Sequence, residues 1–171
     1  NSFMYIVVGL GNPGEKYRDT RHNTGRMAGE FLNGKVSDIK IFVPDTFMNK
    51  TGPAVAKAMA GKSLKKLIVI YDDLDLPLGA LKISYNRSSG GHKGLESIIK
   101  ALKTKEFIRI RIGISPKRKP SGESAVEKHI LGEFKKPELE ILKKVFKRTS
   151  EAVQTIVSDG REVAMNRFNT K

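Results

Sequence analysis

Three polar residues that could form an acid–base site follow two apolar runs of the chain. Asn12 follows the run 4–10, Asp72 follows the run 67–71, and His22 comes soon after Asn12. If the two runs are parallel strands of one sheet, their carboxyl ends lie at the same edge and the three side chains can meet there. A carboxylate that accepts one ring N–H of a histidine fixes its tautomer and leaves the other nitrogen free to deprotonate water. The pattern therefore predicts His22 as a general base with Asp72 beside it.

The glycines after the first apolar run offer a different interpretation. Gly9, Gly11 and Gly14 fit the G-x-G-x-x-G pattern that cradles the pyrophosphate of a dinucleotide. Pro13, however, removes a backbone N–H from that turn, and a polar stretch follows it in place of an apolar helix. The acid after the second predicted strand, Asp45, also lies well beyond the spacing of about 20 residues that the pattern requires. The residues thus disfavour a nicotinamide or flavin site, and we expect no cofactor.

Metal-dependent chemistry is also disfavoured. The acidic motif at 73–75 resembles the start of a phosphatase that uses an aspartyl nucleophile and Mg²⁺, but Asp159 is the only aspartate beyond it. The carboxylates that such a site needs to hold the metal are therefore missing. The three histidines of the chain form no i, i+4 pair, which argues against a zinc site. We expect no metal.

Three further polar residues each allow two interpretations. His92, at the end of the turn 88–92, is either a structural turn residue or a substrate contact, and the sequence does not decide between them. Asn49 either caps the helix that follows it, which is favoured on the residues alone, or holds a main-chain amide of a bound peptide, since its side chain both donates and accepts. His129 lies in a helical stretch, where a packing or surface role is favoured.

Strands that alternate with helices must position these residues. Apolar runs predict strands at 4–10, 39–43, 67–71, 81–85 and 107–114. Helical periodicity and stop signals predict helices at 26–32, 53–60, 95–102 and 139–157. The strand at 81–85 is expected at a sheet edge, and Arg alternates with Ile in the strand at 107–114, which predicts one face in water. This order predicts a single α/β domain with a largely parallel sheet flanked by helices.

Length and charge narrow the class of protein further. The 171 residues carry 32 Lys and Arg against 18 Asp and Glu, a net charge of +14, and most of the excess lies in the second half. Such an excess suits a polyanion such as nucleic acid, or only a well-solvated surface, and charge alone leaves the two even. Without cysteines, a signal peptide or a bilayer-spanning apolar run, the chain is expected to be cytoplasmic with no membrane partner. We take 4–171 as the domain and 1–3 as a remnant before the natural start.

Six motifs occur in a fixed order along the chain. They are GLGNPG at 9–14, TRHNTG at 20–25, TFMN at 46–49, DDLDLP at 72–77, GGH at 90–92 and RIRIGI at 109–114. Together they resemble the bacterial peptidyl-tRNA hydrolase family over residues 4–168. Six ordered motifs are far more specific than the glycine pattern alone.

The resemblance implies a monomer with a twisted, mixed sheet that works without a metal or cofactor. It implies hydrolysis of the ester between a peptide and the 3′ ribose of tRNA, which recycles the tRNA. His22 is then the base that activates water, and Asp72 orients it. The substrate, peptidyl-tRNA, agrees with the basic charge of the chain.

Five more residues match family positions and receive roles from the resemblance. Asn12 and Asn49 match residues that position the peptide and the attacking water. Met48 and His92 match residues that line the same cleft. Arg111 matches a basic residue that contacts the phosphate end of the tRNA.

The sequence departs from the family pattern in three places. Lys93 stands where the family usually has Asn, and it can donate hydrogen bonds or bind phosphate but cannot accept. Ser84 stands where a basic residue is often found beside the tRNA acceptor end, and Lys82 or Arg87 could substitute for it. The stretch 31–44 is short by about one hairpin, which would trim a sheet edge.

The main alternative function is a non-catalytic RNA-binding protein on the same fold, because fold alone does not settle function. The chain retains His22, Asp72, Asn12 and Asn49 together. Binding alone does not require that set, so we expect catalysis.

Overall fold

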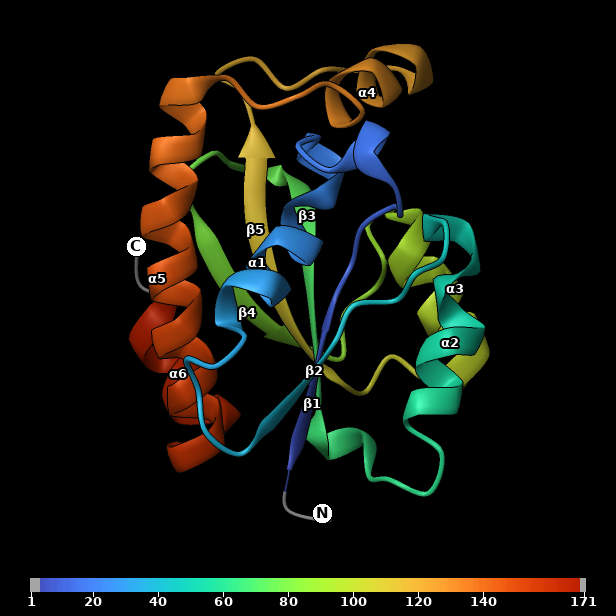
Figure 1. Cartoon of the computed structure of the whole chain (residues 1–171), viewed down its shortest axis with the longest axis vertical. Coiled ribbons are helices and arrows are strands. Elements are labelled where there is room, and N and C mark those ends of the chain that lie inside the picture. Colours follow the sequence, from blue (N-terminus) through green and yellow to red (C-terminus); the bar gives the residue numbers. More distant parts are fainter. Residues whose placement is uncertain (1–3, 170–171) are drawn as a thin grey trace.

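A five-stranded sheet runs through the middle of the protein, with helices on both sides of it (Figure 1). The computed structural model describes residues 4–169, so the predicted remnant at 1–3 and the last two residues of the predicted domain lie outside the described residues. The strand order is β2-β1-β3-β5-β4, and neighbours are parallel except for β4, which is antiparallel to β5. The predicted fold class, a single α/β domain with a mixed, largely parallel sheet, is confirmed.

The observed elements follow the predicted order closely. The strands are β1 (Tyr5–Gly9), β2 (Ile39–Phe42), β3 (Leu67–Pro77), β4 (Leu81–Tyr85) and β5 (Ile108–Ser115). The helices are α1 (Thr24–Leu32), α2 (Thr51–Ala58), α3 (Lys93–Leu102), α4 (Glu123–Ile130), α5 (Lys136–Asp159) and α6 (Arg161–Phe168). Short 3₁₀ turns occur at Glu15–Tyr17, Arg21–Asn23, Met48–Lys50 and Leu64–Lys66. Within residues 4–169, no helix has the length and apolar character needed to cross a membrane.

Two apolar cores flank the sheet because successive side chains of a strand point to opposite faces. Val7, Ile68 and Ile110 face one core, which α1, α5 and α6 complete. Val8 and Val69 face the other core, which α2 and α3 complete. Figure 1 shows α5 and α6 on one side of the strands and α2 and α3 on the other. The central strands are buried on both faces, so they read as continuous apolar runs.

The alternation of Arg and Ile in β5 was predicted to leave one face in water, and this prediction is wrong. β5 lies between β3 and β4, and all of its residues are buried. Arg109 is 0% exposed and its guanidinium donates to the carbonyl oxygens of Lys105 (2.9 Å), Phe107 (2.6 Å) and Arg87. It also lies 4.1 Å from the centre of the Phe107 ring, and burial lowers its pKa to about 10. Backbone carbonyls thus replace water around this side chain.

The third strand continues beyond its predicted end. β3 runs to Pro77 because β5 continues to pair with it, placing Asp72 opposite Ile112. β1, by contrast, ends at Gly9, which lies opposite Ile70. Asp72 is therefore within a strand, yet it lies beyond the end of the neighbouring strand and so reaches the predicted edge of the sheet.

Close backbone contact presses α1 onto the sheet just after the segment that carries His22. A Cβ atom on Gly25 would lie 2.2 Å from the carbonyl oxygen of Ile70, far inside van der Waals contact. Leu10 completes the junction, since its N–H donates to Ile70 O (3.1 Å) and its carbonyl accepts from the N–H of Arg26 (2.9 Å). Only glycine allows α1 to approach β1 and β3 this closely.

Gly25→Ala is expected to lower the free energy of unfolding by about 2 kcal/mol or more, because the added methyl group forces α1 away from β3. Gly29→Ala in the same helix is the matched control. Its Cβ would meet only ordinary contacts, 3.4 Å from Val43 Cγ2, so the higher helix propensity of Ala should leave stability equal or raised by up to about 1 kcal/mol. Chemical denaturation measures both, and equal stability of the two variants would contradict the close-contact explanation.

Candidate active site

A cleft of about 700 Å³ opens at the carboxyl edge of β1 and β3. Most of the residues predicted for the site line this cleft, namely Asn12, His22, Met48, Asn49, Asp72, Arg87, His92 and Lys93. They come from the turn after β1, the 3₁₀ turns at Arg21–Asn23 and Met48–Lys50, β3, the loop between β4 and α3, and the start of α3. Lys82 and Arg111 do not line the cleft.

His22 and Asp72 form the predicted pair. The 3₁₀ turn Arg21–Asn23 directs the ring of His22 at the edge of β3, where Nδ1 lies 2.7 Å from Asp72 Oδ2. Both side chains are buried, with His22 7% and Asp72 3% exposed. Burial lowers the pKa of His22, but the charge of Asp72 and the hydrogen bond to it more than offset burial, so the pKa lies above its usual value. With Nδ1 directed at Asp72, Nε2 is the nitrogen left to take a proton from water.

His92 also bonds Asp72, from the start of α3. Its Nε2 lies 2.9 Å from Asp72 Oδ1, so each carboxylate oxygen contacts one histidine. The centres of the two imidazole rings are 4.9 Å apart. Burial disfavours the charged form of Asp72 and so acts to raise its pKa. The two neighbouring histidines outweigh this effect and hold the pKa of this carboxyl well below its usual range. Asp72 is therefore an anion whenever His22 acts as a base.

His22, Asp72 and His92 also place three potential metal-ligand atoms within 4.8 Å of one another. The i, i+4 spacing rule did not anticipate this group, because His22 and His92 are distant in sequence. Each histidine directs a ring nitrogen at the carboxylate itself, so these ligand atoms bond one another and do not surround a common centre. The donor set fits a hydrogen-bonded acid–base group better than a metal centre.

Asn12 is held by a residue that the sequence did not single out. Asn23 donates from Nδ2 to Asn12 O (2.9 Å), and its Oδ1 accepts from the backbone N–H of Asn12 (2.9 Å). Asn12 Oδ1 accepts from the N–H of Met48 (2.8 Å), which leaves its NH₂ group as a donor for the cleft. Asn23 is 1% exposed, and its place directly after His22 in the TRHNTG motif was the available signal.

Two side chains at the mouth of the cleft are exposed, and one of them was missed. Asn49 is exposed beside the buried Met48 and does not cap α2, since the cap position belongs to Lys50. Phe47 is 53% exposed and stands edge-on to Tyr17, with ring centres 6.1 Å apart. An exposed aromatic ring at a cleft mouth is able to stack on a base or on an apolar side chain. The sequence feature that could have identified Phe47 was the TFMN motif, in which only Met48 and Asn49 were assigned roles.

Lys93 is the first residue of α3 and lies beside the helix N-terminus. A lysine there is unfavourable for the helix, because the first backbone N–H groups already carry partial positive charge. The combination of an ammonium group with that helix end makes this wall of the cleft attractive to anions. The departure from the family pattern therefore adds positive charge to this wall of the cleft.

The three predicted tRNA contacts lie in different surroundings. Arg111 and Lys82 are cross-strand partners on β5 and β4. Lys82 and Arg87 are exposed, but Arg111 is only 5% exposed, with Nε 2.7 Å from Asp73 Oδ2 and Nη1 3.2 Å from Ser84 Oγ. Lys82 and Arg87 are thus accessible to a phosphate, whereas Arg111 is largely occupied in an ion pair.

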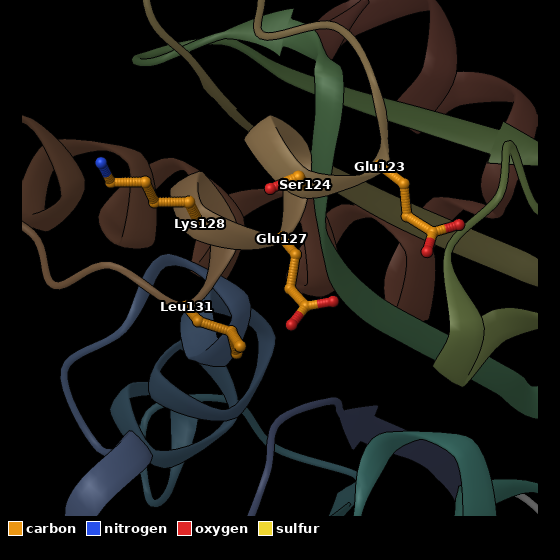
Figure 2. Close-up of a pocket in the computed structure, with 5 residues that line it drawn as sticks. All are labelled: Glu123, Ser124, Glu127, Lys128 and Leu131. Carbon is orange, nitrogen blue, oxygen red and sulfur yellow. The ribbon is translucent and has the colours of Figure 1, made fainter.

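A second hollow of about 520 Å³ lies against α4. Figure 2 shows Glu123 and Glu127 on one side of the helix and Lys128 on the other. Glu123, Glu127 and Leu131 line both hollows. His129, on the same helix, has the packing role that was favoured, because its Nε2 lies 2.8 Å from Ile114 O at the end of β5. No histidine is among the described residues that line the second hollow, so it offers no histidine–carboxylate pair.

The protonation of His22 predicts how ester hydrolysis at this site depends on pH. If His22 is the general base, as the sequence predicts, its neutral form is the active one, and kcat/KM should fall as pH drops through a midpoint above about 6.5, the usual pKa of histidine. Asp72→Asn removes the charge that raises the pKa and leaves burial, so the midpoint should move to lower pH while kcat/KM also falls. The measurement is kcat/KM against pH for both proteins. An unchanged midpoint in the variant would show that Asp72 does not set the pKa of His22.

Comparisons with known proteins agree with this geometry. The family model described as peptidyl-tRNA hydrolase matches the chain over residues 6–37 and 28–171, two stretches that overlap near the turn between α1 and β2. A peptidyl-tRNA hydrolase of Fervidobacterium nodosum is 43% identical over 180 residues, covering 96% of this chain and 96% of that protein. One from Koribacter versatilis is 38% identical over 191 residues, covering 98% of this chain and 94% of that protein.

A solved structure is similar over nearly the whole chain. The crystal structure of peptidyl-tRNA hydrolase from Acinetobacter baumannii superposes with a TM-score of 0.89 at 27% identity, covering 99% of this chain and 96% of that one. Sequence motifs, family model, relatives and three-dimensional structure thus agree. The chain belongs to the peptidyl-tRNA hydrolase family.

Proposed function

We propose that this protein is a peptidyl-tRNA hydrolase that cleaves the ester between a peptide and the 3′-terminal ribose of tRNA. The observation that carries the proposal is the His22–Asp72 pair, buried at 2.7 Å in a cleft of about 700 Å³. Family membership supplies the substrate, and the pair supplies a base for a water nucleophile.

In the proposed reaction, water attacks the ester carbonyl while His22 Nε2 takes its proton. Asp72 holds the ring by Nδ1 and stabilises the imidazolium that forms. The carbonyl oxygen gains negative charge in the tetrahedral intermediate, and donors already in place stabilise that charge, each by about 3–4 kcal/mol in other enzymes. The NH₂ group of Asn12 and the ammonium of Lys93 line the cleft and are the candidate donors. The proton on His22 then passes to the ribose oxygen that leaves.

Selectivity for a peptide over a single amino acid is proposed to reside in Asn12 and Asn49. Their amides line one wall of the cleft and can pair with a main-chain amide of the peptide whatever its side chains are. Met48 and His92 line the same cleft. A free α-amino group is charged and lacks the amide carbonyl, so it would leave these partners unpaired, which lowers the rate of hydrolysis.

The tRNA is proposed to bind across the exposed cations beside the cleft. The net charge of +14 favours a polyanion, and Lys82 and Arg87 are the accessible predicted contacts. The burial of Arg111 supports an indirect role, in which its ion pair with Asp73 neutralises a carboxylate beside Asp72. Direct contact of Arg111 with a phosphate would require breaking that pair.

The enzyme is further proposed to act as a cytoplasmic monomer without a metal or cofactor. One chain supplies the base, its orienting carboxylate and the cleft amides, which supports catalysis by a single copy. The histidine nitrogens at Asp72 are engaged in hydrogen bonds, which supports a reaction without a metal.

The experiment is release of N-acetyl amino acid from N-acetyl-aminoacyl-tRNA in EDTA by wild type and His22→Ala. Wild type should turn over in the chelator, and His22→Ala should lose activity by about a thousand-fold while keeping its tRNA affinity, because only the proton acceptor is gone. Tight tRNA binding without hydrolysis by wild type would favour the RNA-binding alternative. An active alanine variant would remove His22 as the base, and loss of activity in EDTA would reopen a metal mechanism.

The tRNA interface predicts a change in salt dependence. Lys82→Ala should reduce the slope of log affinity against log salt by about 0.7–0.9 if Lys82 contacts one phosphate. Lys62→Ala is the matched control, because Lys62 is equally exposed but precedes β3, at the end of the sheet away from the cleft. Affinity for deacylated tRNA across a salt series measures both. Equal slopes in the two variants would place the phosphate contact elsewhere.

A further inference from the structure

We propose that His92 is a positioning residue for catalysis, which holds Asp72 from the side opposite His22 with its tautomer fixed by the start of α3. The proposal rests on the proposed function, because it assigns His92 a part in the same site beyond lining the cleft. Three observations carry it: the hydrogen bonds of both ring nitrogens of His92, the packing of its ring, and the symmetric contacts of Asp72.

The tautomer of His92 follows from its two hydrogen bonds. His92 is the N-cap of α3, and its Nδ1 accepts from the backbone N–H of Leu95 at 3.2 Å. A nitrogen that accepts an N–H carries a lone pair, so the ring proton lies on Nε2. Nε2–H therefore donates to Asp72 Oδ1 at 2.9 Å. Caps are usually Ser, Thr, Asp or Asn, whose side chains are too short to cap the helix and also reach Asp72.

Packing holds the ring of His92 in this orientation. The ring lies between Tyr71, 5.0 Å away and edge-on, and His22, 4.9 Å away. Its side chain is 7% exposed. A Cβ atom on Gly94 would lie 3.1 Å from His92 Cε1 and 2.5 Å from Met48 Sδ, so glycine at this position makes room for both side chains. These contacts favour the orientation in which the ring faces Asp72.

Asp72 consequently receives one N–H on each oxygen. A carboxylate fixed at both oxygens cannot rotate, so Oδ2 stays aligned with His22 Nδ1. The N–H of His92 also draws negative charge toward Oδ1. Without it, Asp72 would stabilise protonated His22 more strongly and raise the pKa of the base further.

Other charges face this group but are balanced or lie further out. Tyr71 stays neutral, since burial and the nearby Asp73 raise its pKa to about 12. Asp73 is paired with Arg111 and Asp75 with Lys119. The remaining charged side chains on the cleft walls are Arg87, Lys93, Glu123 and Glu127. Among residues 4–169, His22 and His92 are the two side chains that hydrogen-bond directly to Asp72.

Two substitutions separate positioning from capping. His92→Asn keeps a good N-cap for α3 but is too short to reach Asp72. His92→Gln is long enough to offer an amide N–H to Asp72. Loss of the Asp72 contact in His92→Asn should lower kcat by about ten-fold or more with little change in KM, and should move the acid midpoint of kcat/KM to higher pH by about half a unit or more. His92→Gln should recover part of kcat and return the midpoint toward wild type.

The pKa of His22 provides a readout that does not depend on activity. Nuclear magnetic resonance titration of the His22 ring should give a higher pKa in His92→Asn than in wild type, whether or not peptidyl-tRNA is the substrate. A wild type that fails to hydrolyse peptidyl-tRNA would therefore overturn the proposed function without touching this result. Thermal unfolding should show similar stability for both variants.

Three outcomes would overturn the proposal. Wild-type kinetics in His92→Asn would show that His92 only caps the helix. A raised KM with an unchanged kcat and acid midpoint would show that it only contacts substrate. An unchanged pKa of His22 in the titration of His92→Asn would show that the hydrogen bond from His92 to Asp72 does not affect the pKa of His22.

Discussion

Burial of the Asp72 carboxylate is the constraint on which the rest of the site depends. A charge removed from water is costly unless it is paired and hydrogen-bonded, and here two imidazole rings meet that need. The hydrogen bond between His22 and Asp72 both stabilises the buried carboxylate and orients the ring of His22. Stability and reactivity are thus joined in one carboxylate, and His92 contributes to both.

Three segments far apart in the chain must meet for this arrangement to form. The turn before α1 carries His22, β3 carries Asp72, and the start of α3 carries His92. Their convergence depends on close packing at two glycines: Gly25 lets α1 rest against the backbone of β3, and Gly94 leaves room for the side chains of Met48 and His92. The backbone contact at Gly25 therefore fixes α1, and with it the turn that carries His22, against β3.

Features that depend on strand order were predictable from the sequence, whereas several that depend on side-chain packing were not. Apolar runs with short polar ends were enough to place His22 beside Asp72, because parallel strands end at a common edge. The bond of His92 to Asp72 was not predictable, since it depends on the path of the turn before α3. The wet face predicted for β5 was wrong because the terminal NH₂ groups of Arg109 donate to backbone carbonyls, a partner that alternation of residue types does not reveal. Asn23 escaped attention because its partners are the backbone atoms of Asn12.

The carbonyl contacts of Arg109 also bear on how this protein can evolve. Its guanidinium donates hydrogen bonds to the carbonyl oxygen of Arg87, near the start of the loop that leads to His92, and to the carbonyl oxygens of two residues before β5. Every amino acid has the same backbone carbonyl group, so these hydrogen bonds do not depend on which side chains the loop carries. Mutations can therefore change the side chains of the loop while the backbone path that leads to His92 is preserved. Under the proposed function, tRNA contacts made by this loop can change during evolution without displacing His92.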